Sequence, residues 1–505
     1  MAVISPPAVP AAPAAAPRLQ GSLGPVAIVF MVVAAASPLT VIGGGAPLGI
    51  ALGNGAGFPA LFLPVAAVLL LFAVGFMAMT RVVERPGAFY TYIGEGLGRH
   101  LGTGAAWLAV LCYTSIQLGV LAYLGALLAR TGAAVGLPAV PWWVWTLVVV
   151  GAVGVLGYRR IDVSSKVLGV LLVCEILVVV AITSVAVLGG GADGLALDSF
   201  TPATALSGSP GVGLLFAIAA YIGFEATAIY RDEARDPDRT IPRATYGALL
   251  GVTGFYAVGI WGIVVAWGPQ EVVRVALSDP SMLLQATAGL TLGAAGPVVV
   301  DVLIMTSMLA CVLSFHNVLA RYLHSMSGAG LLPAPLEDVH PRHASPHRAS
   351  VVQSLTAAVL TLLFAACGLD PVLEAFTWFS GVGTLAVVLL MLGTSIAALA
   401  YFARHREQAA ELGRWRSAIA PALGAIGLAA LGVVLAANFP MLVGDVGPDG
   451  APAFGVLSTV LVGLCLAAVL VGTVQSLVLR RPAALDAAAP AAVLTTPTLI
   501  GETDV

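Results

Sequence analysis

Long apolar stretches alternate with short polar segments along most of the chain. An α-helix rises 1.5 Å per residue, so about 20 apolar residues cross the hydrocarbon core of a bilayer. Hydropathy predicts about twelve such spans. They fall at residues 24–53, 58–80, 101–130, 141–157, 164–188, 211–230, 244–267, 295–323, 349–366, 372–402, 418–437 and 453–478. The pattern therefore predicts an all-α polytopic protein with about twelve transmembrane helices in a lipid bilayer.

Four other segments break the pattern. Residues 84–99 mix aromatic and charged side chains, which is typical of an amphipathic helix at the membrane interface. Residues 269–292 are expected to form an outer loop with short helices. Both ends of the chain, 1–20 and 481–505, have the composition of disordered cytoplasmic tails.

Composition supports a membrane protein and argues against several other classes. Hydrophobic residues make up 59% of the chain and charged residues only 9%, against about a quarter in soluble domains. A net charge of −3 gives no reason to expect a nucleic-acid partner. The five cysteines are scattered singly and form neither a disulfide nor a metal pattern. The sequence contains no Walker loop and no nucleophile–base motif, so we expect neither an enzyme nor a cofactor.

The basic residues predict the orientation of the helices. With the N-terminus inside, all 22 lysines and arginines except Arg130 and Arg274 fall in inner segments. This strong positive-inside bias predicts a multi-pass protein of the cytoplasmic membrane with both termini in the cytoplasm.

Two predicted spans are interrupted by residues that break helices. The first contains Pro38, which cannot donate a backbone hydrogen bond, and three glycines, so a break is expected between Ser37 and Gly45. The sixth is interrupted at Gly223, two residues before the carboxylate of Glu225. Interrupted helices at matching positions of two halves indicate the binding site of a transporter.

Several short motifs lie in or beside the predicted loops. They are Gly223-Phe224-Glu225 with Glu233, Pro237 and Ile241-Pro242-Arg243-Ala244; Pro86-Gly87-Ala88-Phe89-Tyr90-Thr91-Tyr92 with Leu97-Gly98; and Ala320-Arg321 with Gly330-Leu331-Leu332-Pro333. With these motifs the chain resembles the amino acid–polyamine–organocation superfamily of permeases over about residues 22–402. The resemblance implies a five-plus-five inverted-repeat core, with repeats at 21–190 and 205–402, and two further helices at 415–480. It also implies secondary transport of amino acids or related amines, coupled to protons or by exchange.

The first interrupted helix departs from the family pattern. Relatives usually carry a glycine–serine–glycine break whose amides hold the substrate carboxylate, and the matching position here is Ser37-Pro38-Leu39-Thr40. Pro38 removes one amide, which leaves open whether the substrate has an α-carboxylate. The hydroxyls of Ser37 and Thr40 could replace it, and a half-helix N-terminus still attracts anions.

Two intramembrane carboxylates are candidates for ion coupling, because ionisable residues inside a membrane are costly. Glu225 could carry a proton or could cap the amides freed by the break. Glu175 should lie near the midplane, nine residues after Lys166, where the resemblance places a lysine in some relatives. It could bind a proton or a cation, or form hydrogen bonds between helices.

Thr306 and Ser307 are candidates for a sodium site, and ordinary hydrogen bonding between helices is the alternative. Residues expected to line the substrate site around the second break are Phe216, Ala219, Ala220, Tyr221 and Gly223. The aromatic rings could stack over an amine or pack in the core.

The favoured hypothesis is a proton-coupled or exchanging permease. A sodium symporter of the same fold and a membrane sensor that binds without transporting are the alternatives.

Overall fold

The computed structural model describes residues 24–26, 28, 29, 33, 37–83, 89–159, 165–225, 227, 234–343 and 345–479. Both predicted tails lie outside these residues, as do the motif residues Glu233 and Pro86-Gly87-Ala88. The described part contains no β-strand beyond isolated bridges such as that between Val446 and Pro452.

Helices account for most of the described residues. The α-helices are α2 (Pro38–Thr40), α3 (Ala46–Leu48), α4 (Phe62–Val82), α5 (Phe89–Leu97), α6 (Arg99–Ala134), α7 (Trp142–Arg159), α8 (Ser165–Leu188), α9 (Pro202–Ala205), α10 (Pro210–Ala219), α11 (Pro237–Trp267), α12 (Pro269–Ser278), α13 (Leu283–Leu292), α14 (Gly296–Gly328), α15 (His347–Ala366), α16 (Thr377–Arg404), α17 (Arg406–Arg414), α18 (Ala420–Ala437), α19 (Phe439–Val443) and α20 (Val456–Val478). Shorter 3-10 and π-helical turns are Val41–Gly45, Gly49–Asn54, Gly55–Leu61, Leu197–Phe200, Pro280–Met282, Ala334–Glu337, Pro371–Phe376 and Trp415–Ile419.

The predicted fold class is confirmed. Ten helical segments of the described residues are long and apolar enough to cross a membrane. One of them, Pro38–Val82, covers part of the first predicted span and all of the second, and the sixth predicted span begins with the shorter helix α10. The total of twelve spans, the inverted repeat and the domain limits stay predictions.

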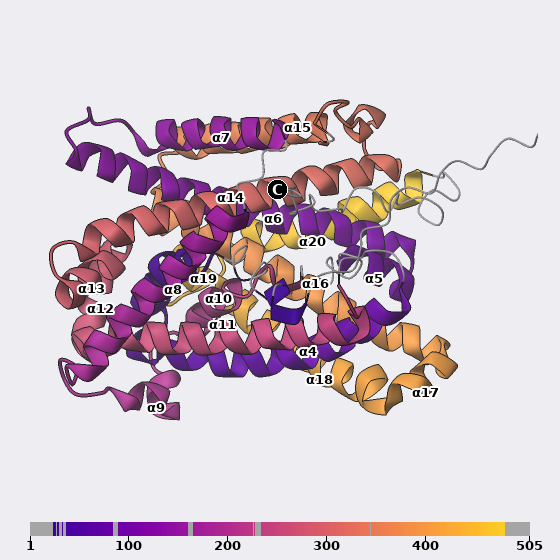
Figure 1. The fold of residues 1–505 in the computed structure, drawn as a ribbon. Helices are drawn as coiled ribbons and strands as arrows, with labels where there is room; N and C mark the ends of the chain where they lie inside the picture. Colours follow the sequence, from indigo (N-terminus) through magenta and orange to yellow (C-terminus); the bar gives the residue numbers. More distant parts are fainter. Residues whose placement is uncertain are drawn as a thin grey trace, which may run out of the picture.

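The long helices form one bundle. Helices α7 and α15 lie along one side, against α6 and α14, and α4, α11 and α18 lie along the opposite side (Figure 1). Between these layers, α10 packs on α16, and α16 packs on α6. The predicted interfacial segment contains α5, and the predicted outer loop contains α12 and α13.

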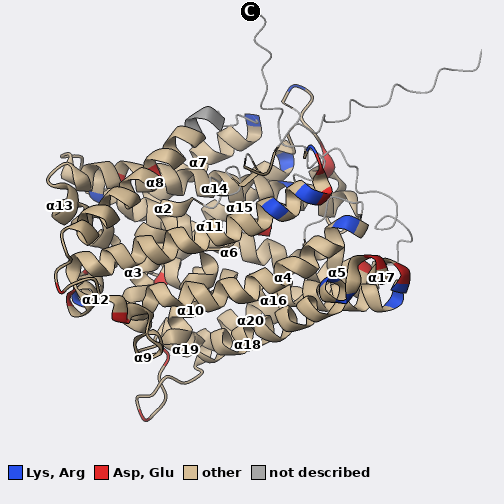
Figure 2. Ribbon diagram, turned by 60° about the horizontal axis from the view of Figure 1, so that its bottom comes forward, with Lys and Arg blue, Asp and Glu red and all other residues tan. Residues whose placement is uncertain are grey.

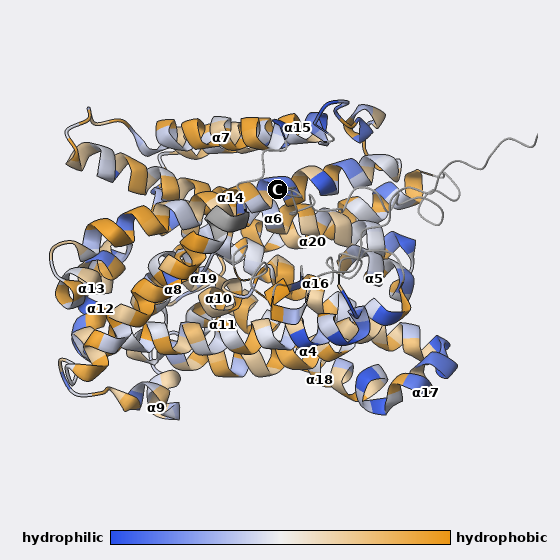
Figure 3. Ribbon diagram, in the orientation of Figure 1, coloured by the Kyte–Doolittle hydropathy of each residue, from blue (hydrophilic) through white to orange (hydrophobic). Residues whose placement is uncertain are grey.

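Charged residues gather at the ends of the bundle. Arginines are concentrated at the end that carries α5 and α17 (Figure 2). Hydrophobic residues cover much of the length of the helices between the ends (Figure 3). Large apolar side chains are exposed there, including Leu177 at 59% and Val433 at 70%. Water would penalise such a surface, whereas lipid would not, so the molecule is a multi-pass membrane protein.

Candidate functional site at the two interrupted helices

The first interruption lies at Ser37. This residue has φ 50° and ψ 73°, a left-handed conformation that residues other than glycine rarely adopt. The helix starts at Pro38, whose fixed φ suits the first helical position and whose missing N–H would lack a partner there in any case. Helical turns then continue from Pro38 to Asn54.

The expected break across Ser37 to Gly45 is therefore shorter than predicted, because the glycines are helical. Val41–Gly45 is a π-helical turn. A Cβ on Gly43 would lie 2.5 Å from Ile304 Cδ1, and one on Gly44 would lie 3.0 Å from Tyr123 Cε1. The two glycines allow α6 and α14 to approach the helix closely, and they do not interrupt it.

Glu175 joins three helices at this first break. Its Oε2 atom accepts the backbone N–H of Leu39 at 3.1 Å and the hydroxyl of Ser307 at 3.0 Å. The Thr40 hydroxyl donates to Ser307 Oγ at 3.4 Å. The side chain of Glu175 on α8 is only 5% exposed. The carboxylate thus occupies the N-terminus of the restarted helix, where a free amide and the helix dipole favour negative charge.

Two neighbouring residues behave differently from Ser307. Thr306 donates its hydroxyl to the carbonyls of Val302 and Leu303 in its own helix, so it does not join the cluster. The Ser37 hydroxyl is buried beside the Cys311 thiol and has no hydrogen-bond partner of good geometry among the described residues. Of the two predicted hydroxyl residues, Thr306 and Ser307, Ser307 alone therefore joins the Glu175 cluster.

The second interruption has a similar design. Helix α10 ends at Ala219, turns follow, and Gly223 takes φ 110°, which a residue with a side chain would adopt only with strain. The Oε2 atom of Glu225 accepts the N–H of Gly223 at 2.8 Å. Its Oε1 atom accepts the hydroxyl of Tyr113, on α6, at 2.9 Å. A carboxylate therefore satisfies a freed amide at each interruption.

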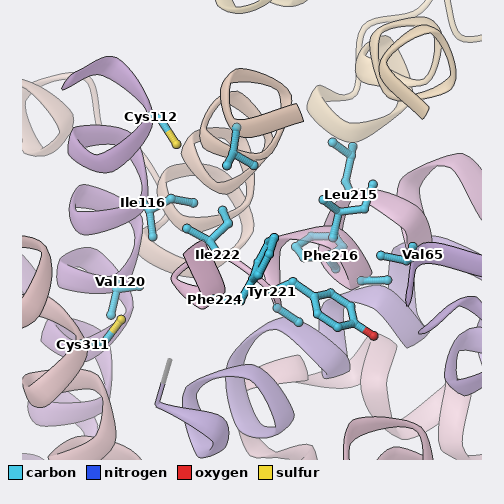
Figure 4. Packing of buried hydrophobic residues seen from close by; sticks show 14 of the residues in the cluster. Val65, Cys112, Ile116, Val120, Leu215, Phe216, Tyr221, Ile222, Phe224 and Cys311 are labelled. Atoms are coloured by element: carbon cyan, nitrogen blue, oxygen red, sulfur yellow. The ribbon is translucent and has the colours of Figure 1, made fainter. Parts of the chain in front are cut away.

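The aromatic residues near the second break pack tightly. Phe216 and Tyr221 are buried, and Figure 4 shows them among apolar neighbours that include Val65. The Tyr221 hydroxyl lies 2.9 Å from Thr253 Oγ1 and donates to the carbonyl of Phe62. This geometry agrees with the alternative in which the Tyr221 ring packs in the core and does not stack over an amine.

The other predicted residues around the second break lie close by. Phe224 meets Phe72 edge to face, with ring centroids 6.0 Å apart. Ala220 is buried, and Ala219 is half-buried at the end of α10. Ala220 and Phe224 line a small apolar pocket against α11.

Sequence reasoning missed Tyr113. It is a buried tyrosine in the long helix α6, and nothing in its neighbours along the chain marks it. Its hydrogen bond to Glu225, 112 positions away, is what distinguishes it. The structure thus brings Leu39, Thr40, Glu175 and Ser307 into one cluster and Tyr113, Gly223 and Glu225 into another.

Comparisons with known proteins agree with this architecture. The family model for amino acid permeases matches residues 28–483. An uncharacterized transporter of Mycobacterium tuberculosis is 29% identical over 257 residues, which are 48% of this chain and 55% of that protein. The branched-chain amino acid permease BcaP of Bacillus subtilis is 26% identical over 382 residues, 70% of this chain and 78% of the permease.

A third relative is the serine/threonine exchanger SteT of Bacillus subtilis, 25% identical over 290 residues that cover 56% of this chain and 63% of SteT. The chain spans little more than half of the mycobacterial transporter. The family match, in contrast, runs through nearly all of the described helices. The chain belongs to the amino acid permease family, whose members are transporters and not enzymes.

Proposed function

We propose that the protein is a secondary active transporter of amino acids that alternates access around the two interrupted helices. Of the relatives named above, BcaP is named for branched-chain amino acids and SteT for the exchange of serine and threonine, and a further one, FywP of Lactococcus lactis, is named for aromatic amino acids. All are neutral amino acids, so a neutral amino acid is the proposed substrate, with related amines as the wider class.

The observation that carries the mechanism is the contact of Glu225 with the freed amide of Gly223. An ionised carboxylate accepts this N–H strongly, and a protonated carboxyl accepts it weakly. Binding of a proton would release the amide to the carboxylate of the substrate. Proton and substrate would then favour each other's binding, as linkage requires of a symporter.

Glu175 supports the same logic at the first break, where it holds the amide of Leu39. With Pro38 lacking an N–H, a substrate carboxylate that approached this helix end would compete with Glu175 for the Leu39 amide. Glu175 would therefore act as a gate for carboxylate binding, while the half-buried Glu225 takes and releases the coupling proton.

A sodium-coupled symporter is the second candidate, and a specific observation favours it. Glu175, Ser307 and Thr40 bring one carboxylate and two hydroxyl oxygens together at the first break. Hard cations prefer oxygen ligands of this kind. In this alternative the ion binds at Glu175, and Glu225 only caps the second break.

Uptake into proteoliposomes tests both candidates. Wild type, Glu225→Gln and Glu175→Gln would be assayed with labelled amino acids and polyamines under a proton gradient, a sodium gradient, or internal substrate alone. Glu411→Gln, an exposed carboxylate on α17, is the matched control. We expect Glu225→Gln to lose proton-driven uptake and to keep exchange.

Other results would contradict the proposal in different ways. If sodium stimulates uptake, and if this uptake persists in Glu225→Gln but is lost in Glu175→Gln, the coupling ion is sodium and binds at the first break. Binding without uptake under every gradient would indicate a sensor.

The proposed location, the cytoplasmic membrane with both termini inside, follows from the charge bias of the loops.

A further inference from the structure

We propose that three tyrosines, Tyr113, Tyr322 and Tyr90, form a proton relay between Glu225 and the cytoplasmic face. This inference rests on the proposed proton coupling and adds the route by which the coupling proton leaves. The three residues come from three helices, α6, α14 and α5, so only the packing of the bundle brings them into line.

The first link is a direct hydrogen bond. The Tyr113 hydroxyl donates to Glu225 Oε1 at 2.9 Å, and the tyrosine is only 6% exposed. A phenol both donates and accepts hydrogen bonds. Tyr113 can therefore receive a proton from Glu225 on its oxygen while it passes its own proton onward.

Tyr322 is the second link. Its ring centroid lies 5.7 Å from that of Tyr113, at an interplanar angle of 60°. Its hydroxyl is buried near the Tyr113 hydroxyl but has no hydrogen bond of good geometry among the described residues. A buried hydroxyl without a partner costs about 1–3 kcal/mol, so a packing role would favour phenylalanine at this position. The hydroxyl is instead available to form the next hydrogen bond when the helices shift.

Tyr90 is the third link and leads to the surface. Its ring lies 5.6 Å from that of Tyr322, and its side chain is half-buried. Tyr90 is the second residue of α5, the helix that lies at the arginine-rich end of the bundle (Figure 2). The positive-inside bias assigns this end to the cytoplasm.

The transfer conserves protons at every step. Protonated Glu225 gives its proton to the Tyr113 oxygen, Tyr113 gives its original proton to Tyr322, Tyr322 gives its own to Tyr90, and Tyr90 gives its own to cytoplasmic water. Glu225 ends as a carboxylate, and each tyrosine ends with one proton. Rotation of the hydroxyls then restores the starting arrangement.

Tyrosine-to-phenylalanine variants test the relay because they remove only the hydroxyl. Tyr322→Phe and Tyr90→Phe would be compared with Tyr401→Phe, a control that removes a buried hydroxyl bonded to Gln408 outside the series. Three readouts are needed in proteoliposomes: uptake driven by a proton gradient, proton entry reported by an internal pH dye, and substrate exchange. The relay predicts that Tyr322→Phe lowers the first two by about tenfold or more and leaves exchange within about twofold of wild type.

Three outcomes would overturn the relay. Proton-driven uptake that survives both Tyr322→Phe and Tyr90→Phe would overturn it, as would an equal loss of exchange, which would indicate a structural role. A wild type that exchanges substrate but ignores the proton gradient would refute both the relay and the proton coupling, while transport itself would stand. A Tyr322→Phe protein that fails to fold in detergent leaves the decision to Tyr90→Phe.

Discussion

At the residue scale, each of the two helix breaks is defined by one backbone amide and one carboxylate that accepts it. Leu39 and Gly223 each present a backbone N–H that the interrupted helix cannot use, and a glutamate accepts each one. In a lipid environment an unsatisfied amide costs several kcal/mol, so these carboxylates stabilise the interrupted helices. In the proposed mechanism, function and stability therefore depend on the same two side chains.

Ser307 and Thr306 give a matched pair for this idea. Ser307→Ala removes a hydrogen bond to the Glu175 carboxylate and should destabilise the protein by about 1.5–3 kcal/mol. Thr306→Ala removes a hydroxyl that bonds only carbonyls of its own helix and should change stability by less than about 0.5 kcal/mol. Thermal unfolding in detergent measures both, and equal losses in the two variants would contradict the assigned role of Ser307.

At the scale of elements, close contact between helices depends on small residues. Gly96 on α5 faces Ala397 on α16, and a Cβ at Gly96 would lie 2.3 Å from the Ala397 carbonyl oxygen. That contact fixes α5 against the bundle core and so positions Tyr90 for the proposed relay.

Gly96→Ala tests this contact. Because the obstructing atoms are the carbonyl oxygen, Cα and Cβ of Ala397, which cannot move without the backbone, the helices must separate, and we expect a loss of about 1–3 kcal/mol in stability. Gly94→Ala is the control, since the nearest atom to its new Cβ is 3.9 Å away. Urea or thermal unfolding of the purified variants compares them; a Gly96→Ala protein as stable as Gly94→Ala would show that α5 is free to adjust.

A loop carboxylate caps the last helix. Asp445 accepts the N–H of Ser458 in the first turn of α20 at 2.8 Å. Hydrogen bonding from the Ser458 hydroxyl and backbone holds the pKa of Asp445 below its usual range. A lowered folded-state pKa stabilises the protein above the ordinary pKa of aspartate, about 3.9, and this stabilisation disappears as the pH falls through the folded-state value.

Asp445→Asn should therefore melt at a lower temperature than wild type at pH 7, and the difference should shrink as the pH falls below about 3.9 and through the lower folded-state pKa of Asp445. Melting curves in detergent across this pH range supply the test. A difference that persists unchanged at low pH would mean that charge at Asp445 is irrelevant to the cap.

At the scale of the whole molecule, the two ends of the bundle differ. Arginines crowd the end with α5 and α17 (Figure 2). Arg130, which the predicted topology places on the outer side, pairs with Asp301 at 3.0 Å, and Gln285 of α13 donates to the same carboxylate. The predicted outer loop, which contains α13, is thereby attached to α6 and α14.

The cysteines provide a native test of orientation. Cys367, in the loop that follows α15, is exposed, while Cys112, Cys311 and Cys465 are buried and Cys174 is half-buried. The predicted topology places this loop outside. A membrane-impermeant maleimide should label right-side-out vesicles, and Cys367→Ser should abolish the labelling. Labelling confined to inside-out vesicles would reverse the topology.

Much of the architecture was decided by the sequence alone. Apolar stretches of span length, arginine-rich loops and the residues Pro38 and Gly223 are local signals, because each acts through hydropathy or backbone geometry at its own position. They were enough to predict the helical membrane fold and two interrupted helices, whereas the family was predicted from the resemblance of its short motifs. Glu175 and Glu225 stood out because a charge within a span is costly.

The partners of those carboxylates were decided only by the tertiary structure. Leu39 lies 136 positions from Glu175, Ser307 lies 132, and Tyr113 lies 112 from Glu225. Helices in lipid are apolar on every side, so no polar face marks which side meets a neighbour. Packing of the bundle selected Ser307 over Thr306, kept the glycines after Thr40 helical, and aligned three tyrosines from separate helices.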